Sequence, residues 1–207
     1  ASGWPVLAYD RYGYGRSESL VGGREPSYRR EESGPVFGEV LRHFGIDKAL
    51  MFGHSDGGAM SVLAAAAHPG VVCGVLACSP TIAIDPFMVD AMGSARRAYE
   101  HEGLREKLQR HHGGGTDAMF WGWYKPWASP KALEWNMSAE IAAIRCPVSA
   151  LFGNQDEYGW RPSAMALFEH GTMALEVIAL SGVGHHPQQR ARGETLQQLQ
   201  RLIGRMG

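Results

Sequence analysis

The sequence lacks an uninterrupted apolar run long enough to cross a membrane, which argues against a membrane-spanning protein. It also lacks an excess of either charge, because 20 Lys and Arg residues balance 21 Asp and Glu residues and leave a net charge of -1. So small a net charge gives no electrostatic attraction to nucleic acid or to an anionic membrane surface. We therefore expect a small-molecule substrate as partner, with neither nucleic acid nor membrane, and the oligomeric state stays open.

The sequence has only three cysteines, Cys73, Cys78 and Cys146, and no two of them form a C-x-x-C pair. This pattern argues against a disulfide framework and against a zinc site. Free thiols in apolar segments, and the lack of any stretch that resembles a signal peptide, predict a cytoplasmic protein. Adjacent histidines such as His185 and His186 point apart on a regular backbone, so we expect no metal.

A complete dinucleotide-binding motif is also missing. Residues 11–17 form a glycine-rich turn, but Glu18 stands where the third glycine of G-x-G-x-x-G would be. No acidic residue follows at the end of a second strand, where a ribose hydroxyl would need one. We therefore expect neither a nicotinamide cofactor nor any other cofactor.

What the sequence does contain is a strong local pattern at Gly53-His54-Ser55-Asp56-Gly57-Gly58. The apolar run before it and the alanine-rich run after it predict a strand, a sharp turn and a helix. A G-x-S-x-G sequence in that context is typical of a nucleophile elbow, which lifts the serine hydroxyl clear of the backbone. The amide of Asp56, at the helix start, could then stabilise an oxyanion. The alternative is a glycine-rich turn with an ordinary serine.

The rest of the chain alternates between apolar strands and helices, as a single α/β domain would. Five runs are predicted as short buried strands: 6–9, 49–52, 71–77, 147–152 and 174–180. Helical spacing from Pro35 to Phe44, with Gly45 as its stop, and a polar C-terminal helix fall between or after them. This order predicts a mainly parallel sheet, and the active site of such a sheet lies beyond the carboxyl ends of its strands.

The alternation stops in residues 81–145, which carry no convincing strand. We interpret this segment as a helical, tryptophan-rich cap inserted into a core made of residues 1–80 and 146–207. One hypothesis is that its aromatic side chains line an apolar pocket over Ser55. The candidate pocket residues are Trp121, Trp123 and Trp127. The other hypothesis is that these rings form the small core of the cap itself, and both can hold for different residues.

Two polar loops complete the candidate chemistry. A serine hydroxyl is a weak nucleophile at neutral pH, so it needs a base, and the base needs an acid that orients it. Residues 153–159, after one predicted strand, contain Asp156, and residues 181–187, after the last strand, contain His185. Both loops should open on the Ser55 side of the sheet.

The elbow, the acid loop, the histidine loop and an early D-R-x-G-x-G-R-S loop together resemble the α/β-hydrolase superfamily over essentially the whole chain. The resemblance implies that Ser55 is the nucleophile, Asp156 the orienting acid and His185 the general base. It also implies that the amide of Asp56 is an oxyanion donor. Glu157 is the competing acid.

The combination of G-H-S-D-G-G, D-E-Y-G and a tryptophan-rich cap is similar to bacterial esterases, enol-lactonases and carbon-carbon bond hydrolases of aromatic degradation. The resemblance implies hydrolysis of a small ester or lactone first and carbon-carbon hydrolysis second. A serine at the elbow argues against epoxide hydrolases and haloalkane dehalogenases, which place an aspartate there. The alternative to an enzyme is a non-catalytic α/β domain whose cap binds a ligand. We expect His54 to pack or hydrogen-bond within the elbow.

The chain departs from the family pattern in one respect. In the family, an earlier strand and its H-G turn supply a second oxyanion amide, and that strand lies between residues 6–9 and the strand before Ser55. This sequence has no such segment, so we expect a gap there and a truncated product. Loss of one oxyanion donor lowers turnover by about 10² to 10³, so we expect impaired activity. Near-parent turnover by the 207-residue chain would contradict that expectation.

Overall fold

The computed structural model describes residues 3–206, and its centre is a parallel sheet. The four strands follow the order of the chain and are β1 (Ala49–His54), β2 (Val72–Cys78), β3 (Val148–Gly153) and β4 (Leu175–Leu180). Every neighbouring pair is parallel. β3 is buried along its whole length, as expected for an inner strand whose two faces are both covered. The prediction of a mainly parallel α/β fold is confirmed.

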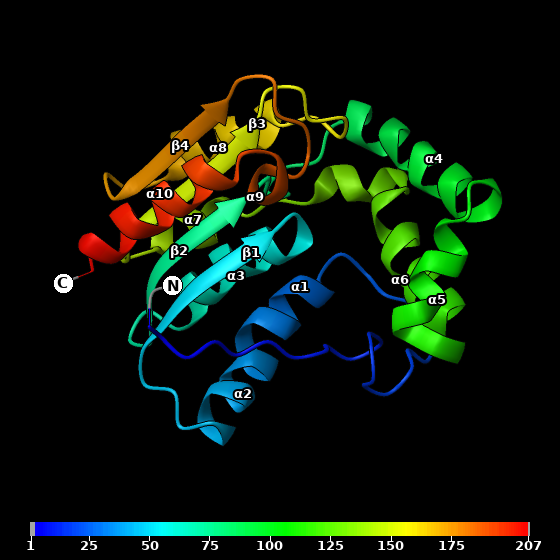
Figure 1. Ribbon diagram of the computed structural model, residues 1–207, viewed down its shortest axis with the longest axis horizontal. Helices are drawn as coiled ribbons and strands as arrows, with labels where there is room; N and C mark the ends of the chain where they lie inside the picture. The colour runs from blue at the N-terminus through cyan, green and yellow to red at the C-terminus, as the bar shows by residue number, and fades with distance from the viewer. Residues whose placement is uncertain (1–2, 207) are drawn as a thin grey trace.

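Helices cover both faces of this sheet (Figure 1). One face packs against α3 (Asp56–Ala67), α7 (Ser138–Ala143) and α8 (Arg161–His170), which enclose the main hydrophobic core. The other face packs against α10 (Arg192–Gly204), where Leu202 meets Leu76 and Leu151 in a smaller cluster. The remaining helices outside the β2–β3 connection are α1 (Tyr28–Glu31), the π-helical segment η1 (Glu32–Val36), α2 (Phe37–His43) and α9 (Pro187–Arg190). Within residues 3–206, no helix combines the length and apolarity needed to cross a membrane.

The connection from β2 to β3 is helical and forms a group beside the sheet, beyond its strand ends (Figure 1). Its elements are α4 (Pro86–His101), α5 (Leu104–His112), η2 (Gly113–Gly115), α6 (Thr116–Trp127) and η3 (Pro130–Glu134). The last helix of this connection, α7, instead packs against α3 and α8. A cap defined by contacts would therefore end before α7, earlier than the predicted boundary at residue 145.

The first predicted strand is wrong, because residues 6–9 form no strand. The segment runs alongside β1 in the same direction without pairing to it (Figure 1), and Val6 is 90% exposed. A hollow of about 960 Å³ lies between the two, lined by both of them. Paired strands lie only about 4.8 Å apart, so a hollow of this size prevents ladder hydrogen bonds. β1 is therefore an edge strand, and the expected gap lies on its outer side.

Candidate active site

Ser55 occupies the sharp turn between β1 and α3. Its backbone has φ 53° and ψ -115°, a conformation that non-glycine residues rarely adopt and that clusters at functional sites. The amide of Ser55 donates to the carbonyl of Cys78, 2.9 Å away at the end of β2, and its own carbonyl accepts from Ala59 at 3.0 Å in the first turn of α3. The neighbouring strand and the helix thus hold the turn from both sides.

Two of the three glycines around Ser55, Gly53 and Gly58, lie so close to neighbouring atoms that a Cβ would be crowded. A Cβ on Gly53 would lie 2.2 Å from the carbonyl oxygen of Gly57, and a Cβ on Gly58 would lie 3.0 Å from Pro80. A Cβ on Gly57 would meet nothing within 4 Å. Gly57 lines the hollow beside β1, so its side of the turn is open.

Ser55, His185 and Asp156 form a continuous chain of hydrogen bonds. His185 Nε2 lies 2.9 Å from Ser55 Oγ, and His185 Nδ1 lies 2.8 Å from Asp156 Oδ2 and 3.0 Å from Oδ1. A carboxylate can only accept, so Nδ1 carries the proton and Nε2 accepts the serine O–H. The backbone amide of Tyr158 also donates to Asp156 Oδ1, at 3.0 Å, which fixes the carboxylate. The loops after β3 and β4 therefore meet at the elbow.

His54 links the elbow strand to the histidine loop. Its Nε2 lies 2.7 Å from the carbonyl oxygen of His185 and must donate, because a carbonyl only accepts. Burial lowers the pKa of His54 to about 4, so the ring is neutral at neutral pH. The ring of His186 packs on His54 with centroids 4.7 Å apart. The expectation for His54 was packing or a hydrogen bond within the elbow; its ring packs on His186, and its hydrogen bond goes to the loop of His185.

Glu157, the competing acid, lies in a different position from Asp156. Its Oε2 accepts the backbone amide of His185 at 3.2 Å, while the imidazole itself pairs with Asp156. Both carboxylates thus contact the same loop, but only Asp156 orients the ring that reaches Ser55.

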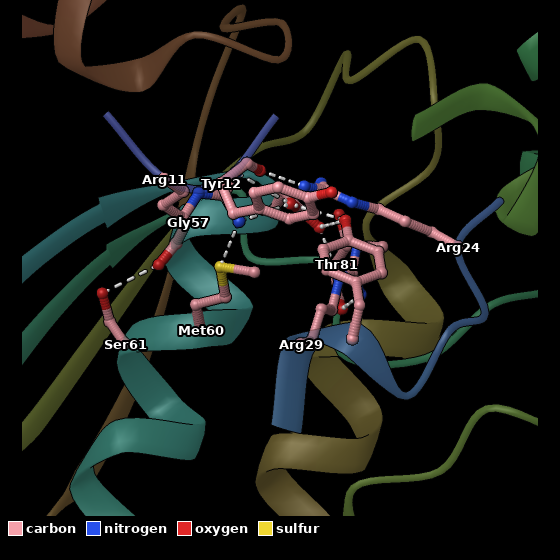
Figure 2. A network of polar contacts seen from close by, with 10 residues as sticks. Arg11, Tyr12, Arg24, Arg29, Gly57, Met60, Ser61 and Thr81 are labelled. Atoms are coloured by element: carbon pink, nitrogen blue, oxygen red, sulfur yellow. Dashed lines mark hydrogen bonds and ion pairs between the residues drawn. The ribbon is translucent and has the colours of Figure 1, made fainter. Parts of the chain in front are cut away.

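Asp56 carries a buried network that the sequence did not indicate. Its carboxylate accepts from Tyr28 Oη at 2.8 and 2.9 Å, from Arg29 Nε, and from Arg11 Nη2 at 3.3 Å. Burial alone would raise the pKa of Asp56, but Arg29 and Arg11 outweigh it and hold the pKa below its ordinary value. Figure 2 shows Arg11 and Arg29 approaching from different segments, with the Met60 sulfur in contact with Arg11.

The backbone amide of Asp56 is free to bind an anion. As the first residue of α3 it has no intrahelical acceptor, and it donates to no other residue among 3–206. The paired arginines immobilise the side chain of Asp56, and with it the start of the helix. An N–H group fixed in this way beside Ser55 suits a developing oxyanion.

A cavity of about 210 Å³ opens beside Ser55 and His185. Trp123 and Trp127, from α6, line it. Trp121 does not line it: its ring packs edge-on against Tyr99, Phe120 and Tyr124. Trp123 and Trp127 thus line the cavity, whereas Trp121 is partly buried against other rings of the helical group and lines a separate hollow with Tyr99.

The same region offers no metal site. Within residues 3–206, no group of three His, Cys, Asp or Glu side chains is arranged to hold a metal ion. Cys73, Cys78 and Cys146 are unpaired. The site itself brings together a serine hydroxyl, an imidazole of fixed tautomer that accepts from it, and a free backbone amide.

The comparisons with known proteins place this geometry in a family context. A family model described as alpha/beta hydrolase fold matches residues 1–150. A search of curated proteins found no significant match.

Solved structures share the fold at low sequence identity. A carboxylesterase study of the thaumarchaeon Nitrososphaera gargenis provides one, with TM-score 0.72 and 19% identity over 96% of this chain and 79% of that chain. Est816, described as an N-acyl homoserine lactone degrading enzyme, has TM-score 0.67 and 20% identity over 92% and 80%. E-2-(acetamidomethylene)succinate hydrolase has TM-score 0.68 and 18% identity over 94% and 80%. At these identities the likeness establishes the fold alone.

Proposed function

Because the chain belongs to the alpha/beta hydrolase fold family, we propose that it is a serine hydrolase that cleaves a small carboxylic ester or lactone. The observation that carries the proposal is the unbroken hydrogen-bond chain from Ser55 Oγ through His185 to Asp156. The named activities of two similar structures, a carboxylesterase and a lactone-degrading enzyme, support this substrate class. Ser55 is the proposed nucleophile.

Acylation begins when Ser55 Oγ attacks the substrate carbonyl. His185 Nε2 takes the serine proton as the Oγ–carbon bond forms, and the resulting imidazolium is stabilised by Asp156 through the Nδ1–H bond. The carbonyl oxygen becomes an oxyanion, which the amide of Asp56 can hold. As the tetrahedral species collapses, the carbon–oxygen bond to the alcohol breaks and His185 returns the proton to that alcohol.

Deacylation repeats these steps with water as the nucleophile. His185 removes a proton from water, the new oxygen–carbon bond forms, and the bond to Ser55 Oγ then breaks. The proton returns to Ser55, and the acid product leaves. For a lactone, the alcohol and the acid stay joined, so a single hydroxy acid is released.

The cavity favours a small substrate. Its volume of about 210 Å³ lies below the range of about 300–1,000 Å³ typical of drug-sized ligand pockets. The rings of Trp123 and Trp127 supply an apolar wall, which suits the hydrocarbon part of an acyl group. We therefore propose that Trp123 and Trp127 of α6 contact the substrate.

A fluorophosphonate probe followed by intact-protein mass spectrometry tests the proposal. Phosphonylation requires an activated serine but no complete turnover cycle, so it reports the triad even when hydrolysis is slow. We expect one adduct that disappears in Ser55→Ala and weakens strongly in His185→Ala. Ser94→Ala, on an exposed part of α4, is the matched serine control and should label normally.

The absence of an adduct on the folded chain would contradict the proposed activation of Ser55. If labelling occurs, 4-nitrophenyl esters and simple lactones should be turned over, with Ser55→Ala inactive. A vinylogous diketone assayed in parallel distinguishes ester hydrolysis from the carbon-carbon hydrolysis that the sequence also allows. Tight ligand binding with full function in Ser55→Ala would instead support a non-catalytic binding domain.

A further inference from the structure

Arg29 is buried in the wall of the cavity that contains Ser55. It lies in α1, is only 1% exposed, and is among the residues that line this cavity. Its guanidinium carbon is 3.7 Å from the ring centre of Trp127, a cation–π contact that fixes the plane of the group. A fully buried arginine beside a proposed nucleophile requires an explanation, since long charged side chains are rarely buried unless paired.

Part of the explanation lies in two protein partners. Arg29 Nε donates to Asp56 Oδ1, and Nη1 donates to the carbonyl oxygen of Thr81 at 2.9 Å. The remaining terminal nitrogen, Nη2, donates to no other residue among 3–206. Its two N–H groups can take a further acceptor. The cavity is where that acceptor can come from.

The charges around Arg29 favour an anionic acceptor. Asp56 is shared between Arg29 and Arg11, so one carboxylate neutralises two guanidinium groups. Glu32 is also near Arg11, and burial raises the pKa of its carboxyl group. Glu157 lies on the cavity wall and accepts from the backbone of the histidine loop. The network of Arg11, Arg29 and Asp56 thus carries a net positive charge, and Arg29 and Asp56 from this network line the cavity.

We propose that Arg29 Nη2 binds a carboxylate of the substrate, so that the cavity is specific for short esters or lactones that carry a free carboxylate. The proposal rests on the proposed serine hydrolase function and specifies its substrate class. The guanidinium is held by Asp56, Thr81 and Trp127 before substrate arrives, so little side-chain freedom is lost on binding. A carboxylate on Nη2 and a carbonyl at Ser55 would both lie in the same small cavity, which limits the acyl group to a few carbons.

A comparison of two substrates on the unaltered chain tests this specificity. The pair is 4-nitrophenyl hydrogen succinate, which carries a carboxylate, and 4-nitrophenyl pentanoate, which has a similar length and no charge. We expect kcat/KM to be about tenfold or more higher for the succinate ester, the factor expected from one charge-assisted hydrogen bond. Equal values, or a preference for pentanoate, would overturn the proposal while leaving the serine hydrolase function intact.

A binding measurement covers the case in which turnover is too slow to measure. In Ser55→Ala, methyl hydrogen succinate and dimethyl succinate can be titrated by calorimetry without cleavage. We expect the monoester, with its free carboxylate, to bind about tenfold or more tightly than the diester. Equal affinity, or no binding of either compound, would overturn the proposal.

Arg29→Gln and Arg11→Gln form a matched pair, because each removes one positive charge and one partner of Asp56. Arg11 lines the hollow beside β1 and is absent from the Ser55 cavity. We expect Arg29→Gln to bring the succinate-to-pentanoate ratio to about one, whereas Arg11→Gln keeps the ratio even if it lowers both rates. A purely structural role for Arg29 would lower both rates equally and leave the ratio unchanged, which would contradict the proposal.

Discussion

The two sides of β1 differ sharply in how they are supported. On one side, β1 pairs with β2 along its whole length, and the loops after β3 and β4 bring Asp156 and His185 to Ser55. On the other side there is a hollow of about 960 Å³ and an extended segment that forms no strand. The proposed base and the proposed orienting acid both lie in loops of the paired side. The comparison therefore distinguishes the residues proposed to activate Ser55 from any contribution of the outer edge of β1.

Asp156→Asn tests the paired side and should have the largest effect. An asparagine amide can donate to His185 Nδ1 and favour the wrong tautomer, so we expect kcat to fall by about 10⁴. Glu157→Gln is the matched control, because Glu157 accepts the backbone amide of His185 while the imidazole pairs with Asp156. Steady-state kinetics on a 4-nitrophenyl ester measure both. A larger loss in Glu157→Gln than in Asp156→Asn would assign the orienting acid to Glu157.

Asp56→Asn tests the network that joins the elbow to α1 and to the segment beside the hollow. Removing the charge leaves Arg29 and Arg11 without their carboxylate, so we expect the free energy of unfolding to fall by about 3–5 kcal/mol at pH 7. Urea denaturation measures the loss. Glu25→Gln, which breaks an exposed pair with Lys131, should leave the stability nearly unchanged.

The pH dependence of stability gives an independent check on Asp56. Its pKa in the folded state is below the ordinary value of 3.8, so the folded state binds this proton less readily than the unfolded state. Its stabilisation is therefore fully present above that ordinary value and is lost as pH falls through the folded pKa. We expect the unaltered chain to lose more stability than Asp56→Asn between pH 5 and pH 3. Equal losses would mean that Asp56 does not titrate as described.

Phe52 and Leu76 allow a direct comparison of the edge strand with its neighbour. They are register partners on β1 and β2, so their side chains share one face of the sheet, yet Phe52 is 55% exposed and Leu76 is 0% exposed. α10 covers β2 and β3 on that face. We expect Leu76→Ala to cost about 2–5 kcal/mol and Phe52→Ala less than about 1 kcal/mol in urea denaturation. Similar costs would mean that the outer side of β1 is covered in solution.

The three polar residues that the structure brings together were identifiable in the sequence because each belongs to a recognisable local pattern. Ser55 stands in an elbow between strand and helix, and Asp156 and His185 each follow an apolar strand. Parallel strands end at one edge of the sheet, so three local patterns define one place. The α/β fold and the family were predicted correctly for the same reason. The catalytic roles themselves stay predictions.

Features that depend on tertiary packing were not predictable in this way. Residues 6–9 are apolar enough for a strand, but composition does not tell whether a pairing strand is present. Arg29 stands in no motif and meets Asp56 only through packing of α1 against α3. Trp121 could have been separated from Trp123 and Trp127, because residues four apart share a helix face and residues two apart do not.

His54→Phe tests the hydrogen bond from His54 to the loop of His185, the interaction on the paired side of β1 with the smallest expected effect. The substitution keeps an aromatic ring against His185 and His186 but removes the donor to the carbonyl of His185. One neutral hydrogen bond contributes about 0.5–1.5 kcal/mol, so we expect kcat to fall by about two- to tenfold with KM little changed. His54→Gln, whose amide can still donate, should recover part of the rate. Equal loss in both variants would show that ring packing, and not the bond from Nε2, holds the histidine loop.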